Sequence, residues 1–217
     1  MPVLVYCVAE ASPPLNGPPT GVLGQPVSRI EHSGLAVFVS RDPGSDAWTR
    51  PPLRESLLEF HQVLRHLFRS VAILPFRFPT ILSGDRELEA HLESAAERYK
   101  HLLEKYKTSV QMEVLLSAVE KPGAPPAASG TEYLRSRKNQ REEMNEIVAG
   151  LETVAGGAVI EWHGRSLPQG VRWFGRLERD SVDRFNAAMR TWKLPAGYGA
   201  RVSGPWPVTE FFHLDQS

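Results

Sequence analysis

Hydrophobic residues repeat with two different periods along this chain of 217 residues. Val3–Ala9 (VLVYCVA) is continuously apolar and rich in β-branched residues, which predicts a strand buried on both faces. Residues 110–120 (VQMEVLLSAVE) alternate between apolar and polar positions, as a half-buried strand does. Further strands are expected at residues 34–40, 158–164, 170–178, 198–204 and 209–214.

Apolar residues spaced by three and four predict amphipathic helices between these strands. The first helix follows Pro51 and Pro52, which suit a first turn, and its expected buried face is Leu53, Leu57, Phe60, Leu64, Leu67 and Val71. The second follows Asp85, with an expected face of Leu88, Leu92, Ala95, Tyr99, Leu102 and Tyr106. A third is predicted over residues 131–154, and a fourth after Asp180 as N-cap, with Val182, Phe185, Met189 and Trp192 on one side.

Proline and glycine mark the breaks between these elements. Residues 12–26 (SPPLNGPPTGVLGQP) predict a long loop, and residues 121–130 (KPGAPPAASG) form the clearest linker in the chain. This linker divides the chain into two predicted domains, 1–121 and 122–217. Each mixes strands with amphipathic helices that can cover a sheet, so we predict an α+β fold with a small mixed or antiparallel, ferredoxin-like sheet in each domain.

Composition and charge exclude several classes of protein. Apolar residues make up 41% and charged residues 23%, as in globular proteins, and the formal net charge is zero. Because the two halves are each nearly neutral, neither carries the basic surplus of a nucleic-acid binder or of a polybasic membrane anchor. Cys7 is the single cysteine, so an intrachain disulfide is impossible. The sequence shows no signal peptide and no apolar run long enough for a membrane span, which predicts a cytoplasmic protein.

A search for catalytic patterns finds few candidates. The sequence has no P-loop, no dinucleotide fingerprint and no nucleophile elbow. Glu161 and His163 lie two residues apart on one predicted strand face, where they form either a metal or acid–base fragment or an exposed polar edge. The charged run 135–141 lacks interleaved aromatic residues, so a solvated helix face explains it better than RNA binding does. We predict no catalytic, cofactor-binding or metal-binding residues.

Two short segments combine apolar and rigid residues in an unusual way. Arg77 is the one charge in ILPFRFPTIL (73–82), where it either pairs with a buried carboxylate or contacts a partner. In SGPWPVTEF (203–211), Pro205 and Pro207 fix the backbone on both sides of Trp206. The indole therefore either closes the end of a core or offers an anchor to a partner.

The order of these motifs resembles the gas vesicle protein F / gas vesicle protein L family. The resemblance rests on VLVYCVA, GLAVFVS, ILPFRFPTIL, the segment GTEYLRSRK and the late SGPWPVTEF, and it covers nearly the whole chain. It implies two α+β domains of ferredoxin-like character. It also implies an accessory protein of gas vesicle assembly without enzymatic activity, located in the cytoplasm at the gas vesicle.

The partners that the resemblance implies are the small hydrophobic shell protein and other accessory proteins, with no nucleic acid, membrane, small-molecule substrate or cofactor. A minor structural component of the vesicle wall is the alternative. We expect the partner-binding residues to lie in the two unusual segments: Pro75, Phe76, Arg77, Phe78, Gly204, Pro205, Trp206 and Pro207.

Overall fold

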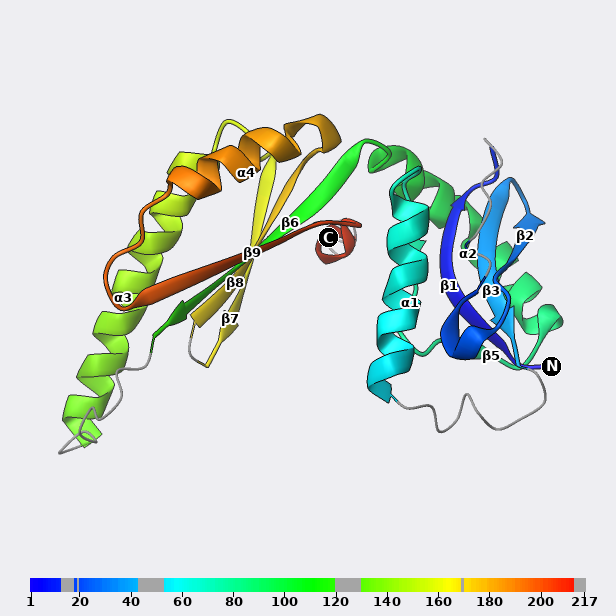
Figure 1. The fold of residues 1–217 in the computed structure, drawn as a ribbon, viewed down its shortest axis with the longest axis horizontal. Coiled ribbons are helices and arrows are strands. Elements are labelled where there is room, and N and C mark those ends of the chain that lie inside the picture. The colour runs from blue at the N-terminus through cyan, green and yellow to red at the C-terminus, as the bar shows by residue number, and fades with distance from the viewer. Residues whose placement is uncertain (13–17, 19, 43–52, 120–129, 169, 213–217) are drawn as a thin grey trace. The chain divides into compact units, whose positions relative to one another are not determined.

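The chain forms two compact units, residues Met1–Thr108 and Ser109–Ser217. The computed structural model describes residues 1–12, 18, 20–42, 53–119, 130–168 and 170–212 (Figure 1). We call residues Met1–Thr108 unit 1 and residues Ser109–Ser217 unit 2, and we describe each unit by itself. The α+β fold predicted from the sequence is confirmed in both, since each contains an antiparallel sheet with two α-helices.

Unit 1 is built around one central strand. Its sheet has the order β2-β3-β1-β4, and β5 also pairs with β1. The element bounds are β1 Val3–Glu10, η1 Val22–Gly24, β2 Ser28–His32, β3 Leu35–Arg41, α1 Leu53–Phe68, β4 Leu74–Pro75, β5 Ile81–Leu82 and α2 Asp85–Lys105. The sequence pattern does not predict the short strand β2, because its apolar and polar positions alternate too weakly.

The interior of unit 1 lies around β1. Every residue from Val3 to Ala9 is fully buried, as its continuous apolar run predicts. A buried phenol needs hydrogen-bond partners, and the hydroxyl of Tyr6 has two: it accepts from the Val22 N–H at 2.9 Å and lies 3.0 Å from Ser40 Oγ. The Val22 bond ties the turn at η1 to the core, so part of the predicted long loop is ordered.

Helix α1 buries a different face from the one predicted. Phe60, Leu64 and Leu67 are buried as expected, whereas Leu57 is 39% exposed. Val71 lies beyond the end of the helix at Phe68, and the side chain of Leu53 lies outside the described residues. The remaining core positions of the helix are Ser56, Val63 and Phe68. The sequence contains too many leucines for the register alone to fix which of them point inward.

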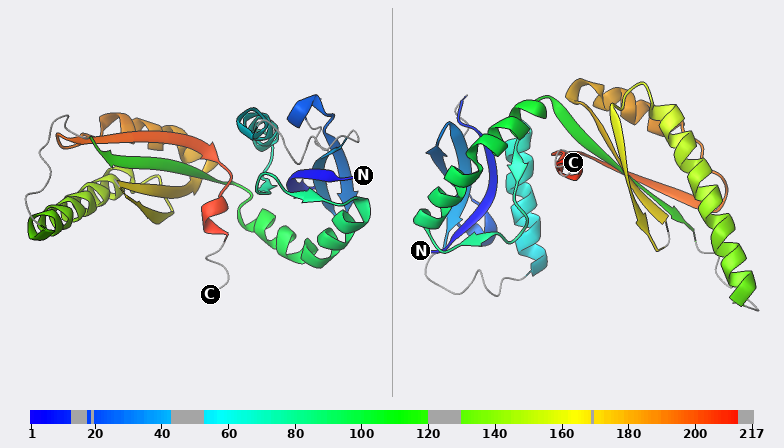
Figure 2. Two further views of the ribbon diagram at one scale, coloured as in Figure 1. Left: turned by 90° about the horizontal axis from the view of Figure 1, so that it is seen from below. Right: turned by 180° about the vertical axis from the view of Figure 1, so that it is seen from behind.

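Unit 2 has the βαββαβ order of a ferredoxin-like fold. Its elements are β6 Ser109–Ala118, α3 Gly130–Ala155, β7 Glu161–Leu167, β8 Gly170–Glu178, η3 Arg179–Ser181, α4 Val182–Thr191, β9 Tyr198–Trp206 and η4 Thr209–Phe211. The strands are ordered β7-β8-β6-β9, and every neighbouring pair is antiparallel. Helices α3 and α4 contact each other beside this sheet (Figure 2).

The position of β6 corrects the predicted domain boundary at residue 121. The compact units divide between Thr108 and Ser109, because β6 pairs along its length with β8 and β9. The predicted linker lies inside unit 2, between β6 and α3. Residues 121–129 of this linker lie outside the described part of the chain, and proline and glycine content does not distinguish a connection within a domain from a linker between domains.

Two tryptophans pack across strands onto glycines. Trp162 is paired in register with Gly175, and Trp173 is paired with Gly164. A Cβ atom at Gly164 would lie 1.8 Å from the Trp173 ring, and one at Gly175 would lie 2.9 Å from the Trp162 ring. Both indoles thus occupy the space above a missing side chain, which explains why the strands contain glycine.

Candidate functional site

The predicted partner-binding residues fall into two separate segments. Pro75–Phe78 belong to unit 1 and Gly204–Pro207 belong to unit 2, so each segment is described within its own unit.

The aromatic residues of the first segment are packed against neighbouring rings. Phe76 donates its backbone N–H to the carbonyl of Tyr6 at 2.9 Å, and its ring lies 5.6 Å from His91 on α2. The ring of Phe78 lies 5.1 Å from that of Phe60 on α1. Both phenylalanines remain partly accessible. They hold the segment between the two helices, and a partner could reach only part of each ring.

Arg77, between these two phenylalanines, is exposed. Its backbone carbonyl accepts a hydrogen bond from Thr80 Oγ1 at 2.6 Å, but no carboxylate among the described residues pairs with its guanidinium group. The interpretation as a buried ion pair is therefore wrong. The chain turns at this point, which directs the arginine outward although both of its neighbours are apolar.

The second segment continues strand β9 and does not form a separate turn before a final strand. Trp206 is half-buried, stands opposite Gln111 of β6, and its indole Nε1 donates to Ser203 Oγ at 3.3 Å. Gly204 has a φ of 130°, and a Cβ there would lie 2.7 Å from Met112 Sδ. The backbone of β9 thus approaches β6 too closely for any other residue, while Pro205 on its outer side stays exposed.

The last predicted strand, residues 209–214, is wrong. Thr209–Phe211 form a single turn of 3-10 helix, and residues 213–217 lie outside the described part of the chain. Phe211 is fully buried, and its ring lies 6.4 Å from His163. The two adjacent phenylalanines gave the segment the composition of a strand, but only one of them enters the core.

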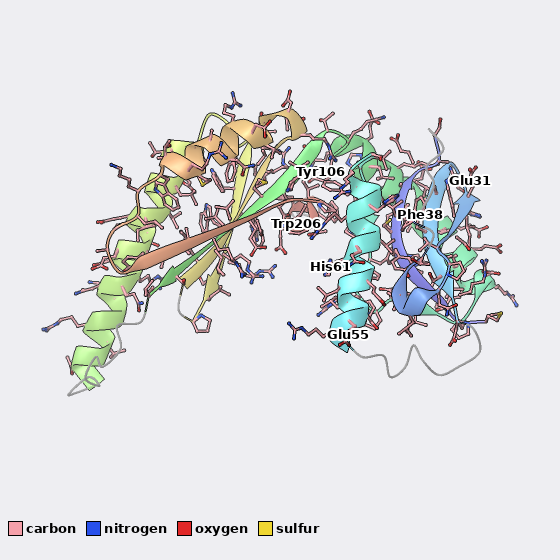
Figure 3. The ribbon with its side chains drawn as sticks, viewed as in Figure 1. Glu31, Phe38, Glu55, His61, Tyr106 and Trp206 are labelled. Atoms are coloured by element: carbon pink, nitrogen blue, oxygen red, sulfur yellow. The ribbon has the colours of Figure 1, made fainter. Side chains whose placement is uncertain are left out.

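An apolar surface lies on α1, where the sequence pattern had placed Leu57 on the buried face. Leu57 and Leu58 are 39% and 57% exposed, and His61 lies one turn further along the same side. Figure 3 shows His61 on the side of α1 that faces away from β1 and β3. Partial burial lowers the pKa of His61, and the charge of Arg65 lowers it further. We call Leu57, Leu58 and His61 the α1 patch; a surplus of leucines over one helical face was its signal in the sequence.

The fragments considered for catalysis serve other purposes in this structure. Glu161 accepts a hydrogen bond from Arg176 Nε at 3.1 Å, and the ring of His163 lies 6.5 Å from that of Phe174. In the charged part of α3, Lys138 pairs with Glu142 at 3.7 Å. The described residues contain no group of three or more histidine, cysteine or acidic side chains able to hold a metal.

No helix in the described part of the chain has the length and apolarity to cross a membrane.

Comparison with known proteins decides the family. The family model described as "Gas vesicle synthesis protein GvpL/GvpF" matches residues 2–166. The chain belongs to the GvpL/GvpF family. This confirms the resemblance that the motif order indicated, and it makes the chain a gas vesicle protein.

Solved structures support the same fold. The crystal structure of the gas vesicle protein GvpF from Anabaena sp. PCC7120 is similar with a TM-score of 0.80 at 11% identity, covering 97% of this chain and 95% of that one. GvpF from Microcystis aeruginosa gives a TM-score of 0.78 at 11% identity, covering 97% and 98%. At such low identity these likenesses show the shared fold alone. A search of curated proteins found no match.

Proposed function

We propose that this GvpL/GvpF protein is an accessory factor of gas vesicle assembly that binds the small hydrophobic shell protein, together with other accessory proteins, at gas vesicles in the cytoplasm. Membership of a family described by gas vesicle synthesis carries this proposal. According to this proposal, the chain acts as a binding protein and not as an enzyme.

The α1 patch is the surface that we assign to the shell protein. Soluble proteins tolerate single exposed leucines, but Leu57 and Leu58 are adjacent and stand on a rigid helix whose opposite side is anchored in the core. An apolar strip of this kind can receive one face of an amphipathic helix. Arg54 and Arg65 flank the α1 patch in the helix and are exposed. Their charges favour solubility of the chain while no partner covers the patch.

Co-expression with the small shell protein, followed by pull-down of this chain, tests the proposal. We expect the shell protein to stay soluble and to co-purify with the wild-type chain. The double variant Leu57→Ser and Leu58→Ser should retain less of it, because both side chains are exposed and their replacement leaves the core intact. Leu134→Ser, which changes a 68% exposed leucine of unit 2, is the matched control.

The same assay tests the two segments predicted to bind a partner, using the variants Arg77→Ala and Trp206→Ala. Loss of binding in either variant, with an unchanged circular dichroism spectrum, adds its segment to the binding surface. Failure of the wild-type chain to co-purify with the shell protein contradicts the proposal. A chain that also stays on purified vesicles after a urea wash would instead be a minor component of the wall.

A further inference from the structure

A hollow on unit 2 lies between α3, the end of α4 and the start of β9. Its volume is about 430 Å³, and the side chains that define it are Glu143, Glu146, Ile147, Trp192, Lys193 and Tyr198. The buried Ile147 forms part of its lining, and all of these residues belong to unit 2. The α1 patch lies in the other unit, so the hollow is a separate feature.

Two aromatic side chains line the hollow. Trp192 follows the last residue of α4 and is half-buried, with its backbone N–H bonded to the Ala188 carbonyl at 3.1 Å. A Cβ at Gly150 on α3 would lie 3.8 Å from the indole Nε1, so this glycine of α3 lies beside the nitrogen-bearing edge of the ring. Tyr198, the first residue of β9, is also half-buried.

Two carboxylates of α3 face these rings. Glu143 accepts a hydrogen bond from the Tyr198 hydroxyl at 2.6 Å through Oε2, which fixes the phenol and leaves Oε1 without a described partner. Removal from water and the bond to Glu143 raise the pKa of Tyr198 to about 12, so the phenol stays protonated and keeps donating. Glu146 is exposed and pairs with no cation among the described residues.

We propose that this hollow binds a basic side chain, arginine or lysine, presented by a protein partner. A cation near the faces of tryptophan and tyrosine is attracted by their π-systems, and a planar guanidinium group can stack on a ring while it hydrogen-bonds to a carboxylate. The carboxylates disfavour an anionic ligand. Lys193 carries the one opposing charge in the lining, but it is exposed and its flexible stem can turn away.

Titration of the ¹⁵N-labelled full-length chain with the peptide acetyl-Gly-Arg-Gly-amide tests this inference by nuclear magnetic resonance. We expect the indole N–H signal of Trp192, identified with Trp192→Phe, to shift in a saturable manner. The matched control peptide contains citrulline, which keeps the shape of arginine but lacks its charge, and should bind at least several-fold more weakly. Equal shifts with both peptides, or none with either, would overturn the inference.

Two variants should change the affinity in opposite directions. Glu146→Gln removes an unpaired carboxylate and should weaken binding about three- to fivefold, whereas Lys193→Gln removes the opposing charge and should strengthen it. Glu142→Gln, on the same helix but outside the hollow, is the control and should bind like the wild type. If Glu142→Gln weakens binding as much as Glu146→Gln does, the peptide responds only to the general charge of α3, and the hollow is not its site.

Discussion

The two sheets of this protein bury their central strands in different ways. In unit 1, both faces of β1 are covered, and seven successive residues from Val3 to Ala9 are fully buried. In unit 2, β6 is buried at Val110, Met112, Val114 and Leu116. On its other face Gln111 is also buried, but Glu113 and Leu115 remain partly exposed. The first strand reads as a continuous apolar run and the second alternates, so the sequence already records which sheet has a polar face.

The polar face of the unit 2 sheet carries a set of ion pairs. Arg176 pairs with Glu161 at 3.1 Å, Arg172 with Glu113 at 3.1 Å, and Arg165 with Glu210 at 2.5 Å. Unit 1 contains such pairs at its periphery, for example Arg41 with Asp85 at 2.9 Å. Unit 1 therefore depends mainly on apolar packing around β1. Unit 2 combines apolar packing on one face of its sheet with charge pairs and the buried rings of Phe174 and Phe211 on the other.

The largest loss of stability is expected from a substitution in the core of unit 1, where both faces of β1 are covered. Phe60 is 1% exposed; its ring stacks on that of Tyr6 and packs at a tilt against that of Phe78, each at a ring distance of 5.1 Å. Phe60→Ala should lower the free energy of unfolding of unit 1 by about 3–5 kcal/mol, because it removes a large buried ring and leaves a cavity. Hydrogen exchange should accelerate in β1 and β3. Equal acceleration in β6 and β8 would show that the units do not unfold separately.

A smaller loss is expected from filling the space beneath a tryptophan in unit 2. Gly164→Ala places a methyl group 1.8 Å from the Trp173 ring, which must then move and weaken its bond to Glu152 at 3.2 Å. We expect a loss of about 1–3 kcal/mol in urea unfolding followed by tryptophan fluorescence. Gly199→Ala is the control, since its nearest new contact is 3.7 Å. Similar losses in the two variants would contradict the steric explanation.

The coupling energies of two ion pairs, one in each unit, should differ by less than the stability loss expected for Gly164→Ala. A double-mutant cycle on Arg176→Met and Glu161→Gln should give a coupling energy of about 1 kcal/mol, because the arginine side chain is only 17% exposed. The same cycle on Arg41→Met and Asp85→Asn should give about 0.3 kcal/mol, since both of those side chains are more exposed. Thermal unfolding measures both. A larger coupling at Arg41 would reverse the contrast drawn between the two units.

The smallest expected effect is the contribution of Tyr198 to the loss of stability at alkaline pH. The pKa of Tyr198 is raised from 10.0 to about 12 in the folded chain, so its contribution to stability is complete below pH 10 and is lost as the pH rises toward about 12. Tyr198→Phe should therefore flatten the fall in stability over this interval, as measured by urea unfolding at several pH values. An unchanged slope would show that the phenol titrates alike in the folded and unfolded states.

The sequence by itself determined the fold class, the main helices and the family. Continuous and alternating apolar patterns located β1 and β6, and the positions of the helices followed from their periodicity and from proline and glycine at their ends. These features are local, because a strand or helix is encoded by the spacing of its own apolar residues. The family followed from the order of several motifs over the chain.

Tertiary structure alone decided which elements belong together and which side chains remain outside. Pairing of β6 with β8 and β9 moved the boundary to Thr108, and packing against β1 turned Leu57 outward although its spacing suited the core. Tyr198 and Glu143, 55 positions apart, meet only because α3 passes the start of β9. Strand pairing and helix rotation depend on contacts between residues distant in the chain, and a single sequence carries no direct record of such contacts.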